Sequence, residues 1–296
     1  MAAVAILACL APGSPARELL TAADLVDLQP TTIAERIIYA DESPHQFGHL
    51  LLPQKSHGHD STGPFPVALL VHGGCWLSQY DIKHLAALEN ALAEDGFAVW
   101  SIEYRRVGDD GGGWPNTFLD VARGADHLRK LAEDHPLDLD RVIVVGHSAG
   151  GQMALWLAAR DRIAEDSDLH LPEPLKLQGV LALAPAPDLA ALHARGTCGN
   201  VIDKLMGGSP EQFPERYDAA SPVELPATGL PQILIGGNLD AGFGDGAFRY
   251  HAVASDPTEV VLREIPGAGH FEVIAPRTPA GREVREELKK LLGRLP

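Results

Sequence analysis

The sequence predicts an α/β fold, a doubly wound and mostly parallel sheet of eight strands with helices on both faces. Three observations predict it. Short runs rich in β-branched and aliphatic residues occur eight times along the 296 residues. Between most of them, apolar residues recur every three or four positions, which is the period of helices that pack on a sheet. Core runs such as VIVV at 142–145 are continuously apolar, as expected of strands buried on both faces.

The first two expected strands, at about 36–40 and 47–52, are separated by a polar turn and predict an antiparallel hairpin at one edge of the sheet. The remaining strands would be parallel, and they are expected at about 67–71, 97–103, 141–146, 178–184, 232–236 and 259–265. Helices are expected at about 82–95, 116–134, 149–161, 186–195, 245–254 and 279–294. We therefore expect right-handed crossovers throughout the parallel part.

The domain organisation follows from the same pattern. We expect residues 1–32 to form an N-terminal extension and residues 33–296 to form one domain. The segment 186–228 is too long for a plain connection between strands, and Gly and Pro break its short helical patterns. It predicts a small lid or cap over one edge of the sheet.

Charge limits the partners. The chain has 24 Lys and Arg against 40 Asp and Glu, a formal charge of -16, so its mean field repels polyanions. Nucleic acid and anionic membranes are therefore not expected as partners. No run approaches the roughly 20 apolar residues of a membrane span. The pattern predicts no oligomeric state.

The three cysteines, Cys9, Cys75 and Cys198, match no zinc spacing and leave one thiol over in any pairing. We expect a reduced or disulfide-independent protein, and a cytoplasmic one. The alternative is export, with the apolar run 4–10 as the remnant of a signal, although no basic residue precedes Arg17.

A candidate nucleophile lies where the expected strand at 141–146 meets the following helix. Residues 146–150 read Gly-His-Ser-Ala-Gly, which is the Gly-x-Ser-x-Gly pattern at a strand-to-helix turn. Such a turn presents Ser148 at the carboxyl edge of the sheet, beside the positive end of a helix. The sequence predicts that Ser148 is a nucleophile.

A serine hydroxyl needs a base, and the base needs an orienting carboxylate. Both are expected after the serine, at the ends of later strands. His270 follows the last expected strand in a glycine-bracketed loop, and Asp240 follows the strand at 232–236. Asp245 stays open as the alternative carboxylate. The predicted catalytic residues are Ser148, His270 and Asp240.

The developing oxyanion needs hydrogen-bond donors placed in advance. The sequence HGGCW at 72–76 ends an early strand, and its glycines let backbone N–H groups turn inward. We expect the N–H groups of Gly74, Cys75 and Ala149 to form this oxyanion hole, with His72 holding the loop. Trp76 and Trp114 are expected either to line a substrate pocket or to pack in the core.

Together, HGGCW at 72–76, GHSAGG at 146–151, GNLD at 237–240 and GAGHFE at 267–272 resemble the α/β-hydrolase superfamily. The resemblance is to its esterase-like members with an HGG-x-W oxyanion loop, a group that includes kynurenine formamidases and bacterial carboxylesterases. It spans about residues 33–294. It implies the α/β-hydrolase fold, a Ser-His-Asp mechanism and no cofactor; no metal site is expected.

The sequence thus predicts a serine hydrolase that cleaves carboxylic esters of small acyl substrates through an acyl-enzyme. An arylformamidase or a peptidase-like amide hydrolase would use the same residues, so it stays open as the alternative. A non-catalytic binding module on the same fold is a remote third reading, because such proteins usually lose a residue of the triad.

Overall fold

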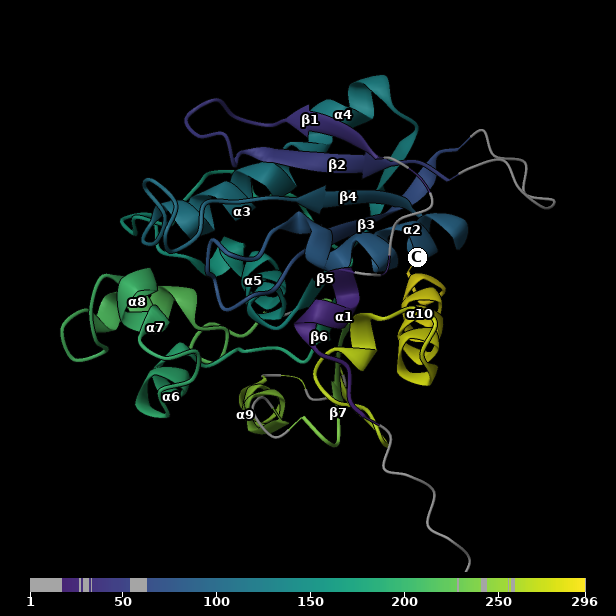
Figure 1. Cartoon of the computed structure of the whole chain (residues 1–296). Coiled ribbons are helices and arrows are strands. Elements are labelled where there is room, and N and C mark those ends of the chain that lie inside the picture. Colours follow the sequence, from purple (N-terminus) through teal and green to yellow (C-terminus); the bar gives the residue numbers. More distant parts are fainter. Residues whose placement is uncertain are drawn as a thin grey trace, which may run out of the picture.

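The computed structural model describes residues 18–26, 28, 32, 34–53, 63–227, 229–240, 244–254, 256 and 259–295. In this part of the chain, eight strands form one sheet in the order β1-β2-β4-β3-β5-β6-β7-β8 (Figure 1). β1 (Glu35–Ile38) and β2 (Phe47–Leu51) form the antiparallel hairpin, and β2 is also antiparallel to β4 (Ala98–Ile102). The other pairings are parallel and join β4, β3 (Phe65–Val71), β5 (Leu137–His147), β6 (Gly179–Leu183), β7 (Gln232–Gly237) and β8 (Val260–Ile265). The predicted fold class is confirmed.

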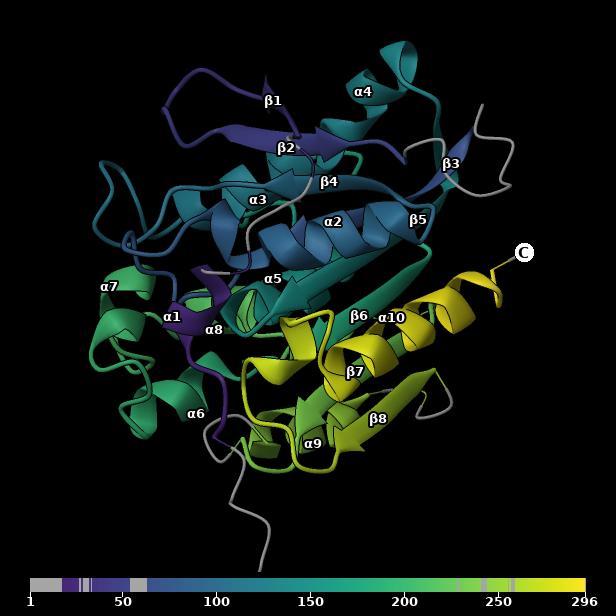
Figure 2. The same cartoon turned by 45° about the vertical axis from the view of Figure 1, so that its right-hand side comes forward.

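Helices cover both faces because successive side chains of each buried strand point to opposite sides. In β3, Val67 and Leu69 belong to one core cluster, and Ala68 and Leu70 belong to the other. The first cluster includes residues of α3 (Asn116–Asp126), α4 (Leu128–Asp134), α5 (Ala149–Leu157) and α9 (Gly244–Val253). The second includes residues of α1 (Ala22–Val26), α2 (Ala86–Glu94) and α10 (Pro279–Leu292). Figure 2 shows α2 and α10 in front of the sheet.

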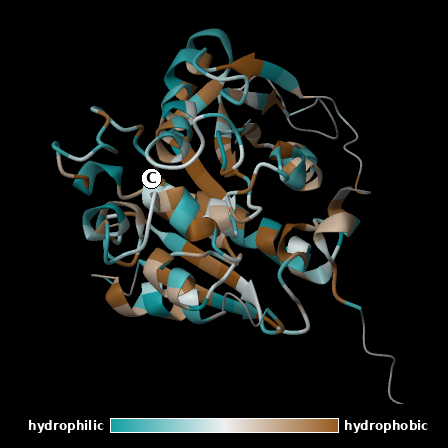
Figure 3. Cartoon of the chain, turned by 60° about the vertical axis from the view of Figure 1, so that its left-hand side comes forward, coloured by the Kyte–Doolittle hydropathy of each residue, from teal (hydrophilic) through white to brown (hydrophobic). Residues whose placement is uncertain are grey.

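Single-turn helices complete the framework: η1 (Ile82–Leu85) before α2, η2 (Arg160–Arg162) after α5, and η3 (Glu272–Ile274) before α10. The sequence also fixes the start of α10. Pro279 is its first residue, and the Thr278 hydroxyl accepts a hydrogen bond from the Gly281 N–H. Colouring by hydropathy shows brown on the central strands and more teal on the outer segments (Figure 3). The apolar side chains of the strands are therefore buried against the helices on each face of the sheet.

The segment 186–228 contains three short helices, α6 (Leu189–Ala194), α7 (Val201–Met206) and α8 (Pro214–Ala220). They lie together on the side toward which β4 points (Figure 1). The Val223 N–H donates to the Pro187 carbonyl and joins the two ends of the segment. We call residues 186–227 the cap. It lies at the edge of the sheet where the predicted site residues are expected.

One expectation is wrong. Cys75, after β3, and Cys198, in the cap, form a disulfide with their Cα atoms 6.0 Å apart. The two residues are separated by 123 positions, so only the fold brings them together. Cys9 and the apolar run 4–10 lie outside the described residues. Among the described residues, no helix has the length and apolar character needed to cross a membrane.

Candidate active site

The segment around Ser148 forms a sharp turn between β5 and α5. Ser148 has φ 56° and ψ −117°, a backbone conformation that is strained for a residue with a side chain. The glycines of the motif permit this turn by close approach. A Cβ on Gly146 would come within 2.0 Å of the Gly150 carbonyl oxygen, and one on Gly150 within 2.1 Å of the Val71 carbonyl oxygen. The turn therefore requires the Gly-x-Ser-x-Gly spacing.

His270 and Asp240 meet at the same edge of the sheet. His270 Nδ1 lies 2.7 Å from Asp240 Oδ2, and the side chains are 18% and 7% exposed. The carboxylate can only accept, so Nδ1 donates, and a neutral imidazole then has Nε2 as its acceptor. The His270 ring centre is 4.6 Å from that of His147, the residue before Ser148. Asp245, the alternative carboxylate, is 81% exposed and lies 3.5 Å from an Arg195 nitrogen instead.

The loop after β3 has three successive residues in the left-handed region. Gly74, Cys75 and Trp76 have φ of 112°, 52° and 54°. The loop lies against the serine, because a Cβ on Gly73 would come 3.1 Å from the Ser148 Cβ. Consecutive residues in such unusual conformations can turn several N–H groups toward one concave space. Ala149 begins α5, so its N–H belongs to the first turn and has no acceptor within the helix.

A buried hydrogen-bond network fixes the start of that loop. His72 Nε2 lies 2.9 Å from Glu103 Oε1, the Tyr104 hydroxyl donates to the His72 carbonyl at 2.7 Å, and the two rings stack. Glu103 also accepts from the Ile82 N–H at 3.0 Å. Burial alone would raise the pKa of Glu103, but His72 and Arg106 outweigh it and lower the pKa. A charged Glu103 therefore ties together the segments that follow β3 and β4.

The two tryptophans differ in their positions. Trp76 is 1% exposed and donates from Nε1 to Gln152 Oε1 at 3.2 Å, so of the two expected roles it takes core packing. Trp114 is half-buried, and the Arg216 guanidinium of the cap lies 5.3 Å from its ring centre. The backbone N–H of Trp114 donates to the Leu205 carbonyl of the cap at 2.7 Å. Trp114 therefore joins the loop before α3 to the cap.

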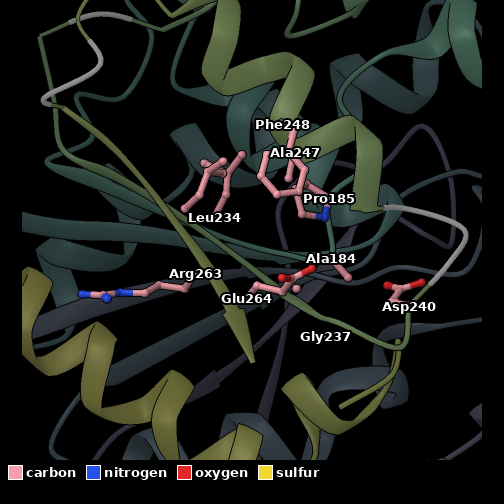
Figure 4. Close-up of a pocket in the computed structure, with 11 residues that line it drawn as sticks. Ala184, Pro185, Leu234, Gly237, Asp240, Ala247, Phe248, Arg263 and Glu264 are labelled. Carbon is pink, nitrogen blue, oxygen red and sulfur yellow. The ribbon is translucent and has the colours of Figure 1, made fainter. Parts of the chain in front are cut away.

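A small cavity of about 40 Å³ lies beside Asp240. Figure 4 shows Phe248 and Ala247 of α9 on one side, Glu264 of β8 on another, and Asp240 at one end. A cavity of this size can hold water. It adjoins the carboxylate that contacts His270.

Two histidines near the site had no role in the sequence-based prediction. His84 Nε2 lies 2.8 Å from His147 Nδ1, and His147 Nε2 lies 2.9 Å from the His270 carbonyl oxygen. Burial, with His72 and His270 nearby, lowers the pKa of His84 to about 3. Burial, with His270 and His84 nearby, also holds the pKa of His147 well below its usual value. His147 stands inside the serine motif, but no sequence signal connects it to His84.

Comparison with known proteins assigns the family. The BD-FAE family model matches residues 54–241, which is more than half of the chain and includes Ser148 and Asp240. The chain belongs to the BD-FAE family. Esterase LipC of Mycobacterium tuberculosis is 26% identical to this BD-FAE member over 246 residues, covering 79% of the chain and 59% of LipC. LipM of the same organism, a probable carboxylic ester hydrolase, is 30% identical over 227 residues, which cover 71% of this chain and 50% of LipM. The chain thus spans about half the length of these curated relatives.

Solved structures agree on the fold. The phosphonate-inhibited esterase B from Lactobacillus rhamnosis superimposes with a TM-score of 0.77 over 93% of this chain and 91% of that one, at 21% identity. The eight-stranded, mostly parallel sheet with its cap is therefore the α/β-hydrolase fold of esterases.

Proposed function

We propose that this protein is a carboxylic ester hydrolase that uses Ser148 as nucleophile, His270 as base and Asp240 as orienting carboxylate. The observation that carries the proposal is the 2.7 Å bond between His270 Nδ1 and Asp240 Oδ2, formed beside the strained turn of Ser148. A histidine held by a carboxylate at one nitrogen can act as a base through the other. LipC and esterase B are named as esterases and LipM as a probable carboxylic ester hydrolase, which supports the same reaction class.

In the proposed reaction, His270 Nε2 takes the proton of the Ser148 hydroxyl as its oxygen attacks the ester carbonyl. The tetrahedral intermediate collapses, His270 returns the proton to the leaving alcohol, and an acyl-enzyme remains. Water, activated by the same nitrogen, then attacks the acyl carbonyl and releases the acid. Asp240 accepts from Nδ1–H throughout and stabilises the imidazolium.

The oxyanion would receive hydrogen bonds from the backbone N–H groups of Gly74, Cys75 and Ala149. In the described part of the chain, neither the Gly74 nor the Cys75 N–H donates to a backbone carbonyl. The first-turn N–H of Ala149 lies at the positive end of α5. These donors need no rearrangement when the negative charge develops, which is what makes them effective.

We propose small acyl groups as substrates. The direct test is turnover of p-nitrophenyl acetate and butyrate by wild type and by Ser148→Ala, with circular dichroism to verify that both are folded. We expect turnover and fluorophosphonate labelling by wild type only. Equal turnover by Ser148→Ala would refute the assignment. A folded wild type that neither reacts with the probe nor turns over esters would instead support the non-catalytic reading.

The choice between ester and amide needs its own comparison. N-formylkynurenine and an aminoacyl anilide, assayed beside p-nitrophenyl acetate, test the alternative amide hydrolases. We expect the ester to have the highest kcat/KM. A higher kcat/KM for either amide would indicate that the same three residues serve an amide hydrolase instead.

The disulfide bears on the compartment. Disulfides persist in oxidising compartments and are rare in the cytosol. The Cys75–Cys198 bond therefore favours export over the cytoplasmic expectation. Fractionation of the native organism, with a cytosolic marker as control, would test this.

A further inference from the structure

Three histidines from distant parts of the chain form a continuous hydrogen-bond chain. His84 in η1 contacts His147 at the end of β5, and the rings stack with their centres 5.0 Å apart. His147 is fully buried and contacts the backbone carbonyl of His270. Phe271 closes the group, with its ring centre 6.2 Å from that of His84 and 5.8 Å from that of His147.

The partners determine where the hydrogens are. A carbonyl oxygen only accepts, so His147 Nε2 must carry the hydrogen of the 2.9 Å bond. A neutral imidazole has one N–H, so His147 Nδ1 is an acceptor. His84 Nε2 must then donate to it across 2.8 Å. The lowered pKa values of both histidines are consistent with two neutral rings. The hydrogen bonds therefore all point in one direction: His84 donates to His147, and His147 donates to the His270 carbonyl.

This series of hydrogen bonds joins the proposed nucleophile to the proposed base. Ser148 is bonded covalently to His147, and the His147 side chain holds the backbone of His270. The base loop has its own support, because the Gly269 N–H donates to Glu272 at 2.9 Å. That bond stays within the loop and does not relate it to the serine. The His147–His270 hydrogen bond, by contrast, connects the residue next to Ser148 directly to the backbone of the base.

We propose that His84 is a positioning residue: it fixes the His147 tautomer that holds the His270 backbone in register with Ser148. The inference rests on the proposed function for its catalytic consequence, although the hydrogen-bond chain itself does not. Without the His84 donor, His147 can adopt its other tautomer or turn away, and the His270 carbonyl loses its partner. The backbone that carries the His270 imidazole then loses its fixed position relative to Ser148.

The kinetic test compares two amides at one position. His84→Gln retains an N–H donor near the place of Nε2, whereas the shorter His84→Asn withdraws it. We expect His84→Asn to lower kcat for p-nitrophenyl butyrate about 10- to 100-fold with little change in KM, since small errors of alignment cost this much. We expect His84→Gln to restore kcat to within about threefold of wild type. His49→Gln is the matched control, because His49 lines the same cavity of about 780 Å³ as His84 and should leave kcat unchanged.

A second readout is independent of turnover. Long-range ¹H–¹⁵N correlation spectra of the histidine rings at neutral pH should give His84 and His147 as neutral Nε2–H tautomers. The chemical shifts of the His147 ring should change in His84→Asn and should remain as in wild type in His84→Gln. A wild-type His147 that carries hydrogen on Nδ1 would overturn the proposal. So would a folded His84→Asn variant with wild-type kcat, or equal losses in the two amide variants.

The two proposals fail in distinguishable ways. A wild type without ester turnover or probe labelling contradicts the proposed function, while the tautomers still test the histidine chain. If His84→Asn does not fold, the wild-type spectrum and His84→Gln decide.

Discussion

Cys198 of the cap is covalently bonded to Cys75, the middle of three successive residues with positive φ in the loop that follows β3. This bond connects the proposed oxyanion loop to the cap. A residue in the left-handed region gains no stability from its own conformation, so its neighbours must hold it there. The disulfide is one such restraint, and the packing of Gly74 against Tyr80 is another.

Removing the disulfide should therefore affect both stability and activity. We expect Cys75→Ala/Cys198→Ala to lower the free energy of unfolding by about 2–5 kcal/mol, the usual range for a native disulfide. Because the oxyanion loop loses a restraint, kcat should fall as well. Urea unfolding and p-nitrophenyl butyrate kinetics measure the two effects. Dithiothreitol should reproduce them in wild type and add nothing in the double variant; Cys9→Ala serves as the thiol control.

Asp240→Asn should reduce kcat by about 10³- to 10⁴-fold, the size of effect that follows when a catalytic histidine loses the carboxylate that selects its tautomer. Asp245→Asn is the matched control and should keep wild-type kcat, because Asp245 is exposed and contacts Arg195. Both variants should unfold near the wild-type temperature. If Asp245→Asn lost activity and Asp240→Asn kept it, Asp245 would be the orienting carboxylate instead of Asp240.

Gly150→Ala should abolish activity through the backbone rather than through any catalytic group. Its Cβ would come 2.1 Å from the Val71 carbonyl oxygen, so β3 and α5 must move apart. We expect a loss of stability of about 1–3 kcal/mol, as for other overpacked sites. Gly196→Ala is the control, since its Cβ would meet no atom within 4 Å, although its φ of 64° carries a small cost. Activity in Gly150→Ala equal to that in Gly196→Ala would contradict the geometry.

Glu89 in α2 should make stability depend on pH. Burial raises its pKa from 4.5 to about 8. Between these values the folded chain keeps a proton that the unfolded chain releases, so the free energy of unfolding falls as pH rises from about 4.5 to 8. Glu89→Gln cannot titrate, so its free energy of unfolding should rise relative to that of wild type by about 2–5 kcal/mol as pH increases across this window. Urea unfolding at the two ends of the window measures the difference. Glu94→Gln, at an exposed position on the same helix, keeps Glu89, so its free energy of unfolding should fall with pH as that of wild type does.

The sequence predicted the sheet well because buried parallel strands are continuously apolar and the chain alternates them with helices. The residues 142–145 of β5 and the hairpin of β1 and β2 are examples. The expected site residues after β5, β7 and β8 come together because parallel strands end at one edge of a sheet. Asp240 and His270 are 30 positions apart, yet chain order and glycine-rich loops were enough to suggest them.

Other features depend on contacts that local pattern does not encode. The Cys75–Cys198 pairing needs the cap to fold back over the loop after β3, and three cysteines allow several pairings. His84 lies 63 positions before His147, in a segment without a motif. Trp76 could face a pocket or the core, and its burial together with its hydrogen bond to Gln152 in α5 decides for the core. Side-chain direction and long-range pairing are set by the assembled core.

The disulfide also closes a covalent ring of the chain from residue 75 to residue 198. Ser148 lies inside this ring, whereas Asp240 and His270 lie outside it. A protease that cuts one exposed loop within the ring leaves a single covalent molecule, which separates into two fragments only after reduction. A cut between 199 and 239 separates the fragment that carries Asp240 and His270 even without reduction. Electrophoresis with and without reductant would therefore map where the native protein can be cut while Asp240 and His270 stay covalently joined to Ser148.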